Sequence, residues 1–363
     1  MTGINDHPED AEWIDDPIAI VGIGLRLPGS VRTPQQYWEL LTSKGSGGCR
    51  VPSSRYNVDA FLGPKGKPGY VCTDHGYFLD DDLAAFDNSL WSIFSKELGL
   101  LDPQVRLMLE VVYECLESSG TPDCRGRDIG LYVGALGGDW MDIQTRDADP
   151  LYSGSRYVTG FGDYTLSNRV SKELGLTGPS MTIRAACSSS MMALHTACQS
   201  LYSGDCSSAV VGGCNLIFTP RMTSTMSELG VLSPNGSCRS FDARADGYAR
   251  GEAVNAIHIK RLSHALRDGD PIRSVIRSIC INSDGPRSPL YVPSPGSHEL
   301  LIRRSHQLAG IEDLSQTAMI ECHGTGTMVG DAQEGKAVAN VFGEVGGVLI
   351  GSVYMSPDPA RIL

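Results

Sequence analysis

The residues that decide the fold lie in the stretch AMIECHGTGTMVGDAQEGKAVANVFGEVGGVLIGSV, residues 318–353. Residues 318–323 and 347–353 are short apolar runs that predict strands, and residues 332–342 predict the helix between them. A strand, a helix and a second strand in this order are typical of an α/β protein with parallel strands. We therefore expect this part of the chain to be an α/β unit.

The same alternation extends upstream. Ile18 to Gly24 predicts a strand that enters a glycine turn, and Ser208 to Asn215 has the small and β-branched residues of a buried strand. Residues 102–119 predict a helix with Asp102 as its cap and Pro103 at its first position. The other expected elements are helices 34–44 and 296–309, strands 180–183 and 272–282, and loops 45–82 and 144–156. These elements predict an α/β fold with mostly parallel sheet.

Composition excludes several classes of function. The 30 Lys and Arg against 42 Asp and Glu give a net charge of -12, so we expect no uniform basic surface that could bind nucleic acid or anionic lipid. No apolar run approaches the roughly 20 residues of a membrane span, and residues 1–16 form an acidic tail without a signal sequence. The 11 cysteines include no Cys-x-x-Cys pair, which favours a reducing cytosol over a disulfide scaffold or a zinc site. We therefore expect a cytoplasmic protein that needs no metal and binds neither nucleic acid nor membrane.

The first candidate site is Cys187, in the sequence AACSSSM (185–191) between a short strand and a helix. A thiol at a helix N-terminus has a lowered pKa, because unpaired backbone N–H groups and the helix dipole stabilise the thiolate. The alternative is a buried core cysteine, and spacing alone leaves the two interpretations about even. His195 lies eight residues further along the helix and is expected to be too far from the sulfur to act as its base.

The second candidate site is the loop HGTGTMVGD (323–331). Its preceding strand would deliver His323 to the carboxyl end of a sheet, where α/β proteins place their sites. Glycines that alternate with Thr325 and Thr327 would let a substrate approach the backbone. The alternative is a glycine turn with a satisfied histidine.

Two other motifs favour structural interpretations. Gly22-x-Gly24 lacks the third glycine of a dinucleotide fingerprint, because Leu27 occupies that position, and is better explained as a strand-to-loop turn. The charged and glycine-rich segment 240–252 is expected to be a loop held together by salt bridges.

Taken together, the motifs around Cys187 and His323 resemble the ketosynthase domain of iterative, highly reducing fungal polyketide synthases. The resemblance rests on a series of short motifs in a fixed order: IAIVG (18–22) with RLPG (26–29), LDPQ (101–104), GPS (178–180), ACSSS (186–190), FD (241–242) with 245–252, and HGTGT (323–327) with Gly330, Asp331 and Glu334. It implies a thiolase-like fold of two similar α/β halves in αβαβα layers, the second half incomplete. The implied units are a tail (1–16), an N-terminal half (17–262), a truncated C-terminal half (263–353) and a non-matching tail (354–363).

The resemblance also implies roles for individual residues. Cys187 would be the nucleophile that takes an acyl chain as a thioester, with its own backbone N–H in the oxyanion hole. His323 would be the first of two catalytic histidines, and Thr325 and Thr327 would line the tunnel for phosphopantetheine. The implied reaction is decarboxylative Claisen condensation with malonyl-carrier protein. The substrates would be acyl groups on an acyl carrier protein or coenzyme A, with no cofactor bound by the chain itself.

The chain departs from the family pattern in ways that bear on activity. Tyr354 stands where a lysine is expected after Gly351-Ser352-Val353, the second histidine does not follow, and Arg184-Ala185 replaces Asp-Thr. Because enolate charge needs preorganised donors, we expect condensation to be impaired. The alternatives left open are a competent enzyme completed by a partner chain, an inactive remnant, and a non-catalytic module. Such a module would form a homodimer, or a heterodimer with a full-length synthase, through residues 180–185.

Overall fold

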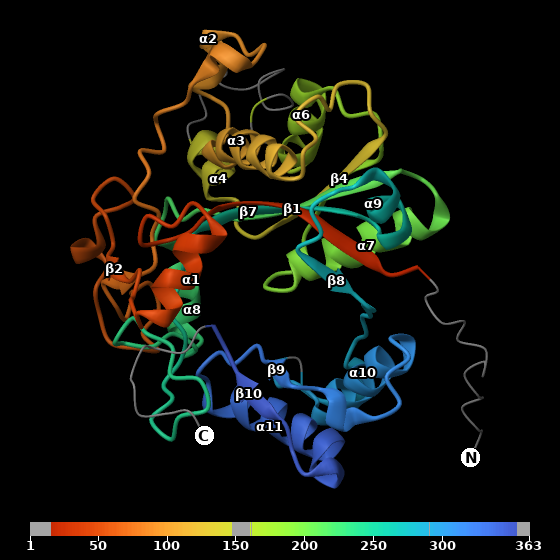
Figure 1. Cartoon of the computed structure of the whole chain (residues 1–363). Coiled ribbons are helices and arrows are strands. Elements are labelled where there is room, and N and C mark those ends of the chain that lie inside the picture. Colours follow the sequence, from red (N-terminus) through yellow and green to blue (C-terminus); the bar gives the residue numbers. More distant parts are fainter. Residues whose placement is uncertain (1–15, 147–159, 161, 290, 354–363) are drawn as a thin grey trace.

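The computed structural model describes residues 16–146, 160, 162–289 and 291–353. A six-stranded sheet of order β5-β4-β6-β7-β1-β8 dominates it (Figure 1). Its strands are β1 (Ile18–Arg26), β4 (Ile129–Ala135), β5 (Ser180–Ile183), β6 (Ser208–Asn215), β7 (Ala253–Arg261) and β8 (Ser274–Ile276). β5, β4 and β6 are parallel, whereas β7, β1 and β8 pair antiparallel with their neighbours. The expectation of a mostly parallel sheet was therefore wrong for half of this sheet. After β6 the chain leaves the sheet, and it re-enters as β7 in the antiparallel direction.

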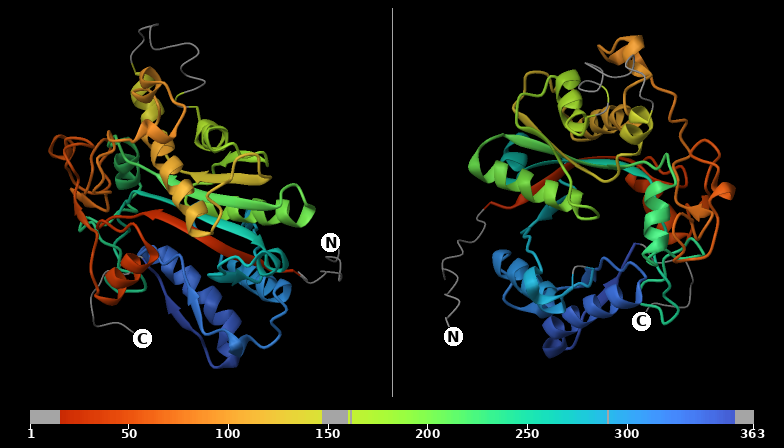
Figure 2. Two further views of the ribbon diagram at one scale, coloured as in Figure 1. Left: turned by 45° about the horizontal axis from the view of Figure 1, so that its top comes forward. Right: turned by 180° about the vertical axis from the view of Figure 1, so that it is seen from behind.

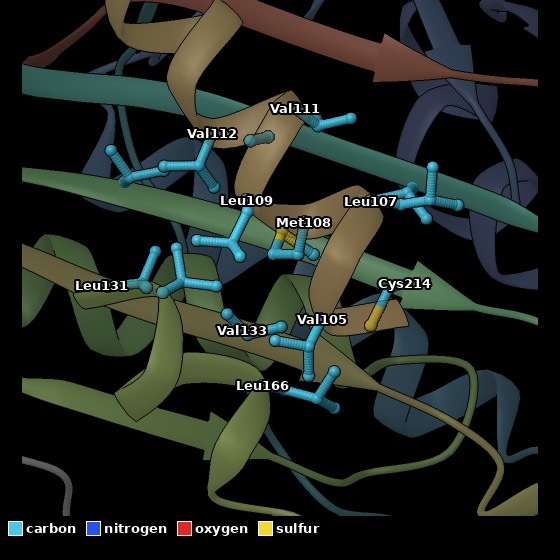
Figure 3. Packing of buried hydrophobic residues seen from close by; sticks show 14 of the residues in the cluster. Val105, Leu107, Met108, Leu109, Val111, Val112, Leu131, Val133, Leu166 and Cys214 are labelled. Atoms are coloured by element: carbon cyan, nitrogen blue, oxygen red, sulfur yellow. The ribbon is translucent and has the colours of Figure 1, made fainter. Parts of the chain in front are cut away.

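Helices cover both faces of the sheet (Figures 1 and 2). α3 (Pro103–Ser118) and α6 (Thr165–Leu174) pack on one face, and α7 (Ser189–Ser203) packs on the other. Figure 3 shows the apolar face of α3 against the strands, with Val105 and Leu109 close to Leu131 and Val133 of β4. This core fixes the position of the strand ends that carry the candidate site.

The motif Gly22-x-Gly24 lies within β1 and not at a turn, which corrects the sequence interpretation. A β-carbon at Gly24 would lie 2.3 Å from the carbonyl oxygen of Val111, and one at Gly22 would lie 2.3 Å from that of Cys115. Both oxygens belong to α3, so the glycines allow this helix to pack closely against β1. Their role is therefore the close packing of this helix on the strand.

The second half contains the βαβ unit that the sequence predicts. β9 (Met319–Glu321) and β10 (Leu349–Gly351) form a parallel pair, with α10 (Pro295–Leu308) and α11 (Met328–Phe342) beside it (Figure 1). The predicted strand 272–282 is shortened to β8, because only Ser274–Ile276 pairs with β1 before the chain leaves the sheet. The remaining residues of that prediction form no regular structure.

The predicted loop region 45–82 contains little regular structure. It has two short strands, β2 (Cys49–Arg50) and β3 (His75–Gly76), and one 3-10 turn, Val58–Ala60. A buried ion pair anchors it: the Arg55 guanidinium donates to the carboxylate of Glu252 over 2.8 and 2.9 Å. The other α-helices of the described residues are α1 (Pro34–Thr42), α2 (Ser95–Leu98), α4 (Asp139–Thr145), α8 (Arg221–Glu228) and α9 (Leu262–Asp268). Most of predicted loop 144–156 lies outside the described residues. Among the described helices, none has the length and apolar character to cross a bilayer.

Candidate active site

Cys187 lies on a sharp turn between β5 and α7. Ala186, just before it, has a φ of 51°, in the left-handed region that residues with a β-carbon rarely adopt. The hydroxyl of Ser189 stabilises the turn, because it accepts a hydrogen bond from the Ala185 N–H at 2.8 Å and donates to the Ala186 carbonyl at 2.6 Å. The Cys187 side chain is exposed at the start of α7. The helix N-terminus expected for this cysteine is therefore present.

Gly134 of β4 lies directly against the backbone that follows the Cys187 turn. A β-carbon at this position would lie 2.4 Å from the Ser190 backbone nitrogen and 2.5 Å from the Ser189 carbonyl carbon. Because both contacts are to backbone, they cannot be relieved by a side-chain rotation. Gly134 therefore allows the start of α7 to sit directly on the sheet, a role that sequence reasoning did not assign.

The loop that carries His323 is held by carboxylates of α11. Glu334 accepts hydrogen bonds from the His323 and Gly324 N–H groups at 2.7 and 2.9 Å. Asp331 accepts from the Gly326 N–H at 3.1 Å and from the Phe241 N–H at 2.6 Å. These contacts fix the backbone of the histidine and join it to the other half of the fold.

Segment 240–252 contributes to this junction as well as to salt bridges. The Ser240 hydroxyl donates to the Gly324 carbonyl, and the Gly247 N–H donates to that of Gly326 at 2.9 Å. The ring of Phe241 packs into the apolar cluster of the second half. The structural interpretation of this segment holds, and the structure adds that it docks the histidine loop against the first half.

The structure brings Cys187 and His323 together. The thiol and the imidazole are hydrogen-bonded, and this contact is the main reason that the pKa of Cys187 is lowered. The backbone N–H groups of Cys187 and Ser188 add to the effect. The same hydrogen bond raises the pKa of His323, against the opposing effect of burial. The pair is therefore biased towards a thiolate and an imidazolium.

The other cysteines of the described region give a clear contrast. Burial raises the pKa of Cys115, Cys198 and Cys322 to about 12 each, so these thiols stay protonated. Cys187 is the cysteine in this part of the chain whose pKa is lowered. The sequence left two interpretations of Cys187 open, a reactive thiol and a buried core residue. The exposed side chain excludes the core position.

Thr325 and Thr327 lie in the same loop and are partly buried. Their hydroxyls are 2.9 Å apart, and the Thr327 hydroxyl accepts from the Gly330 N–H at 3.2 Å as the N-cap of α11. Thr327 therefore has a structural role that the sequence analysis did not foresee. A role of either threonine in substrate binding stays a prediction.

The sequence also pointed to His195, Arg184 and Tyr354. His195 lies on α7, half-buried, and burial lowers its pKa. Arg184, which stands where the family pattern has Asp, forms an ion pair with Asp163 at 2.6 Å and donates to the Gly137 carbonyl at 3.0 Å. Arg184 thus ties neighbouring loops together beside the turn that carries Cys187. Tyr354 lies outside the described residues.

Within the described ranges there is no cluster of three or more histidines, cysteines or carboxylates suited to a metal ion. The site combines a thiol of lowered pKa, an imidazole that can hold a proton, and a helix N-terminus for a developing oxyanion. This set of groups is suited to nucleophilic acyl transfer through a covalent intermediate.

The fold is thiolase-like, and the chain belongs to the beta-ketoacyl synthase family. Residues 15–265 match the family description "Beta-ketoacyl synthase, N-terminal domain" and residues 273–355 match "Beta-ketoacyl synthase, C-terminal domain". Within this family, the chain is a ketosynthase of the kind found in fungal highly reducing polyketide synthases.

The similar proteins are long synthases. The chain is 55% identical over 341 residues to the highly reducing polyketide synthase pspA of Penicillium soppii, which covers 93% of this chain and 13% of that protein. It is 52% identical over 355 residues to the synthase gloL of Glarea lozoyensis, covering 97% of this chain and 14% of gloL. The chain thus spans about one seventh of the length of these relatives.

Solved ketosynthase domains have the same fold. The oxazolomycin ketosynthase domain OzmH KS7 of Streptomyces albus superposes with a TM-score of 0.86 at 33% identity, over 93% of this chain and 59% of that one. The ketosynthase from module 6 of the bacillaene synthase of Bacillus subtilis gives a TM-score of 0.83 at 32% identity, over 93% of this chain and 57% of that one.

Proposed function

We propose that the chain accepts an acyl group from a phosphopantetheine thioester onto Cys187, the loading step of a ketosynthase. The observation that carries this proposal is the hydrogen bond between Cys187 and His323, with the accompanying fall in the thiol pKa. A pantetheine arm on an acyl carrier protein, or the same arm on coenzyme A, would deliver the acyl group. Thr325 and Thr327 are the residues we propose for contact with that arm.

The transfer can be written with all atoms accounted for. His323 holds the proton of the Cys187 thiol, and the thiolate attacks the thioester carbonyl to form a new carbon–sulfur bond. The oxyanion that develops would face the Cys187 backbone N–H at the start of α7. The carbon–sulfur bond to pantetheine then breaks, and the leaving thiolate takes the proton from His323. The products are an acylated Cys187 and a free pantetheine thiol.

We expect the second family step, decarboxylative condensation with a malonyl unit, to be weak in this chain alone. Decarboxylation builds enolate charge, and the loss of one preorganised donor typically costs about 3 kcal/mol or more. Tyr354 occupies the position of an expected lysine, and the motif for the second histidine does not follow it. Acylation needs fewer groups, and the described residues supply the thiol and its histidine.

The test is the intact mass of the purified chain after exposure to hexanoyl-pantetheine. We expect one acyl adduct on the natural chain and none on Cys187→Ala. The half-buried Cys49, on the two-residue strand β2, offers a matched control, since Cys49→Ala should acylate normally. An adduct that persists in Cys187→Ala, or no adduct on folded natural chain, would reject the proposal.

Malonyl-loaded carrier protein added to the acylated chain tests the second step. We expect little or no 3-oxoacyl product. Product formed as fast as the acyl adduct would contradict the proposed impairment while leaving the acylation step intact.

A second candidate function is non-catalytic association with another ketosynthase, and one observation favours it. β5 is an edge strand, hydrogen-bonded to β4 on one side and open on the other within the described region. Met181 of this strand is 36% exposed. An unpaired strand edge is a template for pairing with a second chain. Sedimentation of the purified chain tests this, since Met181→Lys should shift a dimer to the monomer if the edge is the interface.

A further inference from the structure

The backbone N–H and carbonyl groups of His323 and Gly324 are all hydrogen-bonded to side chains. The two N–H groups donate to the carboxylate of Glu334 at 2.7 and 2.9 Å. The His323 carbonyl accepts a hydrogen bond from the Ser352 hydroxyl at 3.3 Å, and the Gly324 carbonyl accepts one from the Ser240 hydroxyl. Three side chains therefore hold the backbone that carries the imidazole.

These side chains come from both halves of the fold. Glu334 lies on α11, and Ser352 directly follows β10, so both belong to the second half. Ser240 lies between β6 and β7 and belongs to the first half. Its hydroxyl therefore ties the histidine loop to the half of the molecule that carries Cys187.

Both serines are buried, with Ser240 5% exposed and Ser352 6% exposed. A buried hydroxyl has lost its hydration and is costly unless it finds a partner within the protein. Burial therefore favours the hydrogen bonds to the two carbonyls over bonds to water.

The glycines of the loop make such outside contacts necessary. Gly324 and Gly326 have φ values of 50° and 71°, in the left-handed region. A β-carbon at Gly324 would lie 2.5 Å from Cβ of Ser352 and 3.3 Å from Cε2 of Phe241, so glycine allows both side chains to pack against the loop. Because glycine has more conformational freedom than any other residue, the position of the loop depends on contacts from outside it.

The position of this backbone matters for the thiol. Hydrogen bonds weaken steeply when their distance or angle is poor. The bond to the His323 imidazole is the main reason that the pKa of Cys187 is lowered. A shift of the His323 backbone would move the imidazole with it and weaken that bond.

We infer that Ser240 and Ser352 are positioning residues for His323, whose hydroxyls hold the two loop carbonyls so that the imidazole stays in contact with Cys187. Glu334 restrains the N–H groups of the same two residues, and the serines restrain their carbonyls. The inference rests on the proposed function, because it gives both serines a part in acyl transfer to Cys187. Since Ser240 bridges the two halves, its loss should have the larger effect.

The experiment follows alkylation of Cys187 by iodoacetamide in the full chain as a function of pH, measured by peptide mass. Ser240→Ala should move the half-maximal pH upward by about half a unit, and Ser352→Ala by less. Ser240→Thr keeps a hydroxyl donor and should restore most of the natural profile. Ser237→Ala is the matched control: it removes a half-buried serine three residues away and should leave the profile unchanged.

A double variant separates positioning from a general loss of stability. If Ser240 acts through the imidazole, Ser240→Ala should cause no further shift when it is combined with His323→Ala. Cys198 is fully buried and should stay unalkylated in every variant. An equal shift with and without His323, or alkylation of Cys198 in Ser240→Ala, would show a general opening of the fold and would overturn the positioning role.

An unchanged profile in either alanine variant would also remove the role of that serine. Alkylation needs no acyl donor, so the two proposals can fail separately. A natural chain that is alkylated at low pH but gains no acyl adduct from hexanoyl-pantetheine would reject the proposed function. Normal acylation with unshifted profiles in both alanine variants would reject the positioning role alone.

Discussion

The thiol of Cys187 and the imidazole of His323 are hydrogen-bonded across the two halves of the fold. Cys187 is fixed by β5 and α7 of the first half, and His323 by β9 and α11 of the second. Their contact depends on how the halves dock, and the docking uses backbone hydrogen bonds of segment 240–252 together with the partly buried ring of Phe241. The reactivity of the cysteine is therefore a property of the assembled halves.

Removing the histidine should make the cysteine less reactive near neutral pH. In His323→Ala the pKa of Cys187 should rise towards its ordinary value, because the largest stabilising contact of the thiolate is gone. The pH at which alkylation by iodoacetamide is half-maximal should move upward, and the rate at pH 7 should fall by about tenfold. His298→Ala, which removes a half-buried histidine of α10, should leave the profile unchanged. An unshifted profile in His323→Ala would contradict the assigned pair.

Glu334 should act on the thiol through the position of His323. Glu334→Ala removes the acceptor of two backbone N–H groups, so the loop can move and the alkylation profile should shift upward, by less than in His323→Ala. Glu334→Gln keeps one carbonyl acceptor and should recover part of the shift. Glu344→Ala, an exposed carboxylate after α11, is the control. Equal profiles for the Ala variant and the natural chain would remove the positioning role.

Gly134→Ala should damage the turn that carries Cys187. The added methyl group would overlap the backbone of Ser189 and Ser190, and overpacking of this kind costs about 1–3 kcal/mol of stability. Acylation of Cys187 should fall more than stability does, since the displaced residues begin α7. Gly99→Ala places its methyl group where no atom lies within 4 Å and should be nearly neutral in both assays. Normal acylation in Gly134→Ala would show that the turn does not need this close contact.

Asp102 should make the protein less stable as the pH rises from 4 to 7. Burial raises the pKa of this carboxyl to about 6, from about 3.9 in an unfolded chain. The folded state binds the proton more tightly than the unfolded chain does. The stabilisation that results is fully present below the pKa of the unfolded chain and is lost as the pH rises through the pKa of the folded state. The difference between the two pKa values corresponds to about 3 kcal/mol in the free energy of unfolding.

The measurement is urea unfolding across this pH range for the natural chain and Asp102→Asn. The variant cannot titrate at this position, so its stability should fall less between pH 4 and 7. Asp123→Asn, at an exposed carboxylate, is the control and should follow the natural chain. Parallel pH curves for the natural chain and Asp102→Asn would exclude Asp102 as the source of the dependence.

Local sequence patterns anticipated most of the elements. Asp102 and Pro103 mark the start of α3, and the apolar runs around 318–323 and 347–353 mark the parallel pair β9 and β10. Cys187 at the start of α7 and His323 after β9 were both expected from strand and helix ends. These features follow from capping and periodicity, which act over a few residues.

Other features could not be found in this way because their cause lies in distant parts of the chain. Gly22 and Gly24 suggest a turn when the sequence is considered alone. They lie within β1, where the absence of a side chain allows α3 to pack closely. The long strand expected at 272–282 ends early, since only Ile18–Ile20 of its partner β1 pair with it. In both cases the deciding contact is tertiary.

Local patterns predict most of the strands and helices, and short motifs in a fixed order indicate the family and point to Cys187 as the candidate nucleophile. The contact between His323 and Cys187, and the hydrogen bonds by which Glu334 and Asp331 hold the histidine loop, are evident only in the folded chain. Capping and periodicity could not reveal them, because these effects act between neighbours in the chain. Desolvation, hydrogen bonding and close packing depend on which distant residues the fold places in contact.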